Sequence, residues 1–162
     1  MRKFLNEVFN GYIQFIDIYN MHKEPKKPFA TYQVLSTDPN GVDTIIREKS
    51  QDNENMISET IIKMFQDSIQ IDVYTNSIAE SKAIAQKIIS DIQFRYREIL
   101  TDRGLGLVNI TSIVPITSKG VSEVEFRANF NIIFSYCLKY TNDIENVDSV
   151  IYREKEWSEW LS

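Results

Sequence analysis

One stretch in the second half of the chain decides the fold: Val124-Glu125-Phe126-Arg127-Ala128-Asn129-Phe130, which continues in the same pattern to Leu138. Apolar and polar residues alternate along it, as they do in a β-strand whose side chains point to opposite faces of a sheet. The pattern predicts a strand from Val121 to about Leu138, with its even-numbered residues facing the core. Because such a strand is longer than is usual in a small domain, we expect it to bend or to extend beyond its own core.

Two further expectations come from the same alternation. Glu123, Glu125 and Arg127 fall together on the face opposite the apolar one, which we interpret as a solvated sheet face. The only cysteine of the chain, Cys137, lies within the apolar run, and we expect it to be a small core residue. A single cysteine cannot form a disulfide within the chain.

Other strands are predicted on both sides of this one in the sequence. Residues 29–36 and 44–49 are rich in β-branched and aromatic side chains, and residues 56–74 carry apolar side chains on one parity. A polar stretch, residues 51–55, separates the last two segments, so together they predict a long β-hairpin with a hydrophilic tip. Residues 105–116 alternate as well, and the turn residues 117–120 connect them to the long strand.

Two amphipathic helices are predicted. Residues 2–19 have their apolar side chains on one arc of a helical wheel. Residues 78–102 repeat this pattern after Ser77, which stands three residues before Glu80 and so has the spacing of a capping box. Arg103 and Gly104 then supply a cationic last turn and a left-handed stop.

The order of these elements predicts an α+β fold with a mainly antiparallel sheet and two principal helices packed on one face. A chain of 162 residues is long enough for one core and short for two, so we expect a single domain over residues 1–162. Residues from about 141 to 162 are mostly polar and are interpreted as a C-terminal extension of that domain.

Composition argues against several classes of function. The net charge is −5, which is opposite to what a general affinity for nucleic acid requires. Charged or amide residues interrupt every apolar run before it approaches the roughly 18 residues of a membrane helix. One histidine, His22, and one cysteine do not make a zinc site, and the five glycines form no phosphate-binding loop. We therefore expect no catalytic residues, no metal and no cofactor, and no membrane as a partner.

One alternative remains on the enzyme side, a metal-dependent nuclease. Glu123 and Glu125 with Arg127 on one strand, together with Asp67 and Asp72 on another, have the residue types that hold Mg²⁺ in such enzymes. The spacing is weak support, because these residues also fit a solvated sheet face. We keep the nuclease as the less favoured interpretation.

Three segments have the composition of association surfaces. Phe94 falls on the otherwise polar side of the second helix, on the side that also carries Ala83. The hairpin tip exposes polar residues that can reach a neighbouring subunit. The C-terminal segment has two tryptophans, and tryptophan is favoured as an interface anchor. The predicted subunit or partner contacts are Phe94, Ala83, Asp52, Asn53, Glu54, Trp157 and Trp160.

Over roughly residues 1 to 140 the chain resembles the neck or tail-terminator proteins of tailed bacteriophages. The resemblance rests on Phe15-Ile16-Asp17-Ile18-Tyr19-Asn20 followed by Lys27-Pro28-Phe29-Ala30-Thr31-Tyr32. It continues in Ile69-Gln70-Ile71-Asp72-Val73-Tyr74, the helix from Ser77, and the strand pair 107–116 and 123–136. The segment after Tyr140, with its two tryptophans, has no counterpart in this pattern.

The resemblance implies a structural virion protein at the junction of neck and tail, made in the host cytoplasm. Members of the family form a ring, commonly a hexamer, that caps the finished tail tube, ends its polymerisation and presents a surface to the head. The implied partners are further copies of the chain, the tail-tube protein and head-completion or connector proteins, with DNA only passing through the lumen. A head-completion or connector adaptor of the neck is the alternative within the same class.

Overall fold

The computed structural model describes residues 9, 12–20, 25–50, 56–119 and 124–145 of the chain. They form two compact units. Unit 1 comprises Met1–Val42 and Lys63–Leu138, and unit 2 comprises Asp43–Ile62 and Lys139–Ser162. Two long strands, β4 and β7, contribute residues to both units. The two units therefore share strands. The expectation of a single domain over residues 1–162 stays a prediction.

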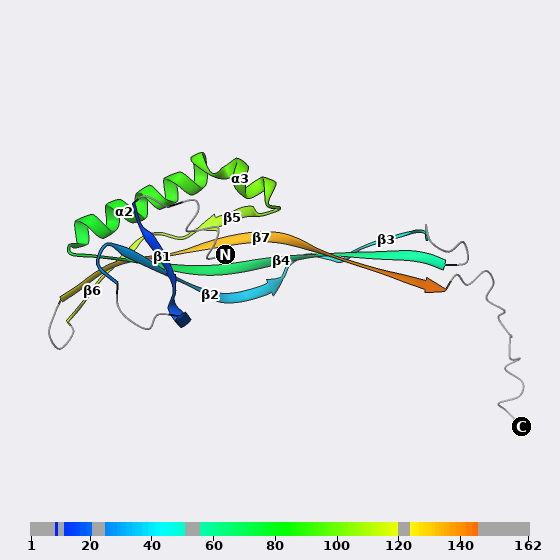
Figure 1. The fold of residues 1–162 in the computed structure, drawn as a ribbon, viewed down its shortest axis with the longest axis horizontal. Helices are drawn as coiled ribbons and strands as arrows, with labels where there is room; N and C mark the ends of the chain where they lie inside the picture. Colours follow the sequence, from blue (N-terminus) through cyan, green and yellow to red (C-terminus); the bar gives the residue numbers. More distant parts are fainter. Residues whose placement is uncertain (1–8, 10–11, 21–24, 51–55, 120–123, 146–162) are drawn as a thin grey trace, which may run out of the picture. The chain divides into compact units, whose positions relative to one another are not determined.

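Strands dominate the described residues. They are β1 (Gln14–Asp17), β2 (Phe29–Pro39), β3 (Thr44–Lys49), β4 (Met56–Thr75), β5 (Gly106–Ile110), β6 (Val114–Lys119) and β7 (Val124–Glu145). In unit 1 the strand order is β1-β2-β4-β7-β5, and β6 also pairs with β7. In unit 2 the strand β3 pairs with β4. The α+β class is confirmed in this strand-rich form (Figure 1).

The sheet is mixed because β1 runs parallel to β2, from Gln14 opposite Phe29 to Asp17 opposite Tyr32. The predicted helix over residues 2–19 is therefore wrong in its second half, where β1 is followed by the 3-10 turn η1, Ile18–Asn20. Phe15 lies in this strand and is fully buried in the core, a position that suits an aromatic side chain. The earlier part of that predicted helix lies outside the described residues, apart from Phe9.

The second helix begins and ends where its local signals place it, but it is not continuous. It consists of α2 (Ile78–Ser90), a π-helical turn η2 (Asp91–Arg95) and α3 (Arg97–Asp102). The Ser77 hydroxyl accepts the amide proton of Glu80 at 3.3 Å, which confirms the predicted cap. The Glu80 carboxylate reaches the amide of Asn76 at 3.4 Å, one residue before the cap.

Within unit 1, α2 and α3 lie together over one face of the sheet (Figure 1). The core between the helices and the sheet is made of alternate residues of β4 and β7 and of one side of the helices, as the alternation predicts. Phe9 closes it, with its ring 5.2 Å from Phe15 and 5.6 Å from Tyr96. The buried core includes Phe15, Ala30, Ile69, Ile71, Val73, Ala85, Ile88, Ile92, Leu100, Ala128, Phe130, Ile132 and Phe134.

Several boundaries and positions differ from the sequence predictions. Residues 105–116, predicted as one strand, form β5 and the start of β6, and β6 continues to Lys119 through the predicted turn. The strand β2 runs on to Pro39, beyond the predicted end at residue 36. The strand β7 extends to Glu145, so the first residues assigned to a C-terminal extension belong to the sheet. Cys137 is exposed, which corrects its assignment to the core. It stands at an odd position in β7, and alternation turns it away from the face that buries Phe134.

Candidate assembly surfaces

The first candidate surface begins at the end of α3, where the chain reverses. Gly104 has a φ of 71°, a left-handed conformation that glycine adopts without steric cost. Its amide donates to the carbonyl of Thr101, and the amide of Leu105 donates to the carbonyl of Leu100, both at 2.9 Å. These two bonds form a Schellman motif, which brings Leu105 back against Leu100.

A π-helical turn, η2, lies in the helix before this reversal. The amide of Tyr96 donates to the carbonyl of Asp91 at 2.8 Å, five residues earlier, so the turn holds one extra residue. The Tyr12 hydroxyl donates to the Asp91 carboxylate at 3.0 Å, and the Lys87 ammonium lies 3.9 Å from the centre of the Tyr12 ring. Burial raises the pKa of the Tyr12 phenol, and Asp91 raises it further, so the phenol stays a donor.

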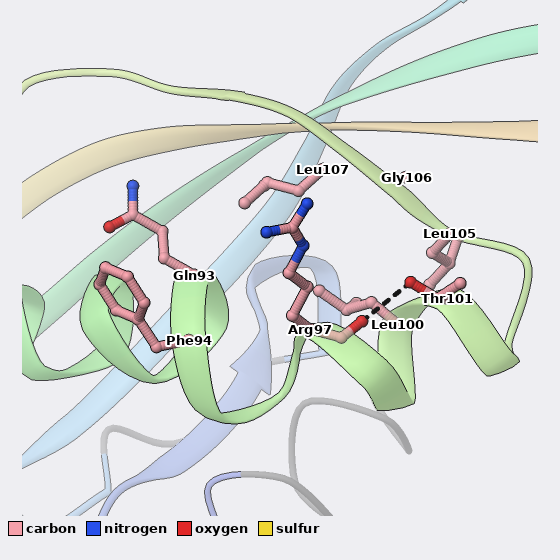
Figure 2. A pocket seen from close by; sticks show the side chains of 8 residues that line it. All are labelled: Gln93, Phe94, Arg97, Leu100, Thr101, Leu105, Gly106 and Leu107. Atoms are coloured by element: carbon pink, nitrogen blue, oxygen red, sulfur yellow. Dashed lines mark hydrogen bonds between the residues drawn. The ribbon is translucent and has the colours of Figure 1, made fainter.

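A groove of about 540 Å³ lies between this helical segment and β5. Figure 2 shows the side chains of Gln93 and Arg97 extending from the helix toward the β5 side, where Leu107 lies. The Thr101 hydroxyl is tied back to the carbonyl of Arg97 at 3.0 Å (Figure 2). We call this hollow the Phe94 groove; its lining residues are Gln93, Phe94, Arg97, Leu100, Thr101, Leu105, Gly106 and Leu107.

The Phe94 groove combines apolar walls with one positive charge. Phe94 is 79% exposed, while Leu100 at the base is buried. Arg97 is the only charged residue of the lining, and none of the ion pairs between described residues involves it. An exposed aromatic ring beside an unneutralised guanidinium suits an apolar ligand that carries negative charge.

The predicted contact residue Ala83 is exposed on α2, but it is not part of this groove. Its position, eleven residues before Phe94, puts it about three turns away along the helix. The structure therefore brings Phe94 together with Arg97 and Leu107 instead. The roles of Phe94 and Ala83 in assembly stay predictions.

The second candidate surface is formed by the strands of unit 2. We call it the arm: β3, residues 56–62 of β4 and residues 139–145 of β7. The hydroxyls of Thr60 and Thr141 are 3.1 Å apart, so these two side chains share one face. Alternation then places Ile61 and Tyr140 on the other face, and Ile45 joins them there because it pairs with Ile61.

The face of the arm that carries Ile45 exposes large apolar side chains. Ile45 is 54% exposed and Tyr140 53% exposed. The Arg47 guanidinium and the Glu59 carboxylate lie 2.6 Å apart on the same face and hold β3 against β4. Among the described residues of unit 2 there are strands and no helix, so nothing described there covers this face.

Two other predicted contacts cannot be placed. The hairpin tip with Asp52, Asn53 and Glu54 lies outside the described residues, although β3 and β4 confirm the hairpin itself. Trp157 and Trp160 also lie outside them.

The two aspartates of the nuclease alternative do not converge, and Glu123 lies outside the described residues. Asp67 and Asp72 have opposite parity on β4 and therefore lie on opposite faces of the sheet. Asp67 accepts a hydrogen bond from the Thr37 hydroxyl at 2.7 Å. Asp72 is buried, accepts from Gln70 at 2.6 Å and Asn129 at 3.0 Å, and lies 3.8 Å from Arg127. The described residues contain no cluster of acidic, histidine or cysteine side chains that would hold a metal.

Sequence reasoning found Phe94 but missed the residues that surround it. Arg97 and Leu107 are brought together by the chain reversal at Gly104, for which Arg103-Gly104 was the available signal. Ile45 and Tyr140 were missed for another reason. The strand of Ile45 was predicted, whereas the predicted end of the long strand at about Leu138 left Tyr140 outside it. The absence of a covering layer is in both cases a tertiary property.

Comparison with known proteins identifies a family for the chain. No helix among the described residues is long and apolar enough to cross a membrane. No curated protein matches the chain. The family described as phage neck terminator protein matches residues 1–156, nearly the whole chain. That family is one of structural virion proteins and is not known for enzymatic activity. The chain belongs to the phage neck terminator protein family.

Proposed function

We propose that this protein forms a closed ring of identical copies, commonly six in such assemblies, that caps the finished tail tube. The ring ends polymerisation of the tube and offers its other side to the head-completion or connector proteins of the neck. Its partners are thus other copies of the chain, the tail-tube protein and the head side of the neck. DNA passes through the lumen without being bound, in keeping with a net charge of −5.

The observation that carries the proposal is the open apolar face of the arm. A sheet of three short strands needs a second layer to bury its apolar side chains. Ile45 and Tyr140 lie on one face of the arm and each is more than half exposed. A second chain supplies such a layer, and exposed apolar surface of this kind is typical of association sites.

A ring is the form of assembly that fits a terminator. Head-to-tail contacts form a ring when the repeated rotation between neighbours closes after one full turn, and a closed ring leaves no free interface for further growth. Such a contact joins two different surfaces of each subunit. The arm and the Phe94 groove are two candidate surfaces for contacts between subunits.

The experiment compares two single substitutions in β3 by light scattering coupled to size exclusion, with and without tail-tube protein. Ile45→Asp places a charge on the open apolar face, and we expect it to abolish assembly. Ile46→Asp is the matched control, because Ile46 is 40% exposed, adjacent in sequence and on the opposite face. We expect it to assemble as the wild type does.

Both variants change exposed residues, so circular dichroism should show the wild-type fold for each. A wild-type chain that stays monomeric even with tail-tube protein would contradict the ring. Equal assembly of the two variants would show that this face of the arm is not part of the interface between subunits.

A further inference from the structure

We propose that the Phe94 groove binds the segment Glu156-Trp157-Ser158-Glu159-Trp160-Leu161 of a second copy of this chain. The inference rests on the proposed ring and adds the pair of surfaces that joins one subunit to the next. The groove belongs to unit 1, and the segment follows the last strand of unit 2.

The chemistry of the segment complements that of the groove. The segment contains three large apolar side chains and two carboxylates, with no lysine or arginine. The groove offers Phe94, Leu105 and Leu107 as apolar contacts and Arg97 as its only charge. Arg97 pairs with no carboxylate among the described residues, so its charge is available to Glu156 or Glu159.

The size of the groove also suits this ligand. Its volume of about 540 Å³ lies within the roughly 300–1,000 Å³ of sites that bind drug-sized ligands, which is room enough for two indole rings. Trp157 and Trp160 are close in sequence, so one short segment can deliver both rings to the groove. Tryptophan buries more apolar area than most side chains and commonly anchors interfaces.

A second copy is the occupant because a ring needs a donor and an acceptor surface on every subunit. The segment is an independent donor, since it follows the end of β7 at Glu145 by ten residues. Repeating the same contact around a ring would bury Phe94 of every subunit, which is 79% exposed in the single chain.

Intrinsic fluorescence of the full-length protein tests the proposal directly. Trp157 and Trp160 are the only tryptophans of the chain, so all tryptophan emission reports on this segment. We expect the emission of the wild type to move to shorter wavelength as concentration rises through the range in which light scattering shows assembly. Phe94→Ala should require about tenfold or more higher concentration for the same shift, since a large apolar contact is lost.

Two variants serve as matched controls. Tyr19→Ala removes an aromatic ring that is 76% exposed and does not line the groove, and Lys82→Glu reverses an exposed charge on α2. Both should show the wild-type shift. Arg97→Glu should lose it, and Arg97→Glu combined with Glu156→Lys and Glu159→Lys should regain it, because the ion pair is restored with its direction reversed.

The following results would contradict the proposed contact between the Phe94 groove and the segment. A short-wavelength emission already present at concentrations where the chain is monomeric would mean that the segment binds its own chain, which overturns the proposal. A ring whose tryptophan emission stays unshifted would overturn this contact and leave the proposed ring intact. A shift in Phe94→Ala equal to that of the wild type would also overturn it. Absence of both assembly and shift would reject the ring and this contact together.

Discussion

Replacing Asp72 with alanine should destabilise the protein strongly, although the residue takes no part in either candidate surface. Asp72 is 3% exposed, and its carboxylate accepts hydrogen bonds from Gln70 and Asn129 and faces Arg127. The Nε atom of Arg127 is already buried without a hydrogen-bond partner. Removing the carboxylate leaves this guanidinium without its nearby counter-charge and two amide donors without their acceptor.

The magnitude follows from these contacts. Breaking a buried ion pair by removing one partner costs about 3–5 kcal/mol. The Arg127 side chain is 32% exposed and lies 3.8 Å from Asp72, so water compensates part of the loss and we take about 3 kcal/mol. For a chain of this size that corresponds to a fall in Tm of roughly 6–12 °C.

Urea denaturation followed by circular dichroism measures this free energy of unfolding. Asp38→Ala is the control, because Asp38 is an exposed aspartate on β2, and we expect a change within about 0.5 kcal/mol. Asp72→Ala combined with Arg127→Met should be less destabilised than the sum of the two single variants, since the second change removes the orphaned charge. A loss below about 1 kcal/mol for Asp72→Ala, or strict additivity, would refute the reasoning.

Two further predictions concern the ends of the second helix. Ser77→Ala should lower the free energy of unfolding by about 1 kcal/mol, because the Glu80 amide loses its acceptor. Ser90→Ala is the control, because Ser90 is exposed and caps no amide, and it should leave the free energy of unfolding nearly unchanged. Equal urea midpoints for the two variants would contradict the capping role of Ser77. Gly104→Ala should cost about 1–2 kcal/mol through the backbone alone, because φ is 71° and an added Cβ meets nothing within 4 Å. Gly104→Asn should cost less, since asparagine tolerates this conformation, and thermal melts that rank the two variants the other way would argue against a purely conformational cost.

Local signals predicted the parts of the fold that depend on neighbouring residues. Ser77 and Gly104 mark the start and stop of the helix because capping and left-handed geometry act within a few residues. Alternation also predicted the core face of β7, and this is confirmed, because the even positions from Ala128 to Phe134 are buried. The parity rule also holds for Cys137, whose exposed odd position was overlooked in favour of its apolar neighbours.

Contacts between distant residues explain what the sequence did not predict. The π-helical turn is held by Tyr12 on Asp91, 79 residues apart, and no helical wheel includes that contact. The short β1 fits a helical pattern equally well until β2 is available as a partner. The Phe94 groove likewise exists only once β5 folds back beside the helix, so the sequence identified Phe94 and not its surroundings.

Addition of this protein to growing tail tubes tests the central claim most directly. Electron microscopy of polymerising tail-tube protein, with and without the chain, measures tube length and the structure at the tube ends. The account predicts tubes that stop growing and carry at one end a ring of copies, each of 18.9 kDa. Tubes that continue to elongate with bare ends at saturating amounts of the chain would contradict it.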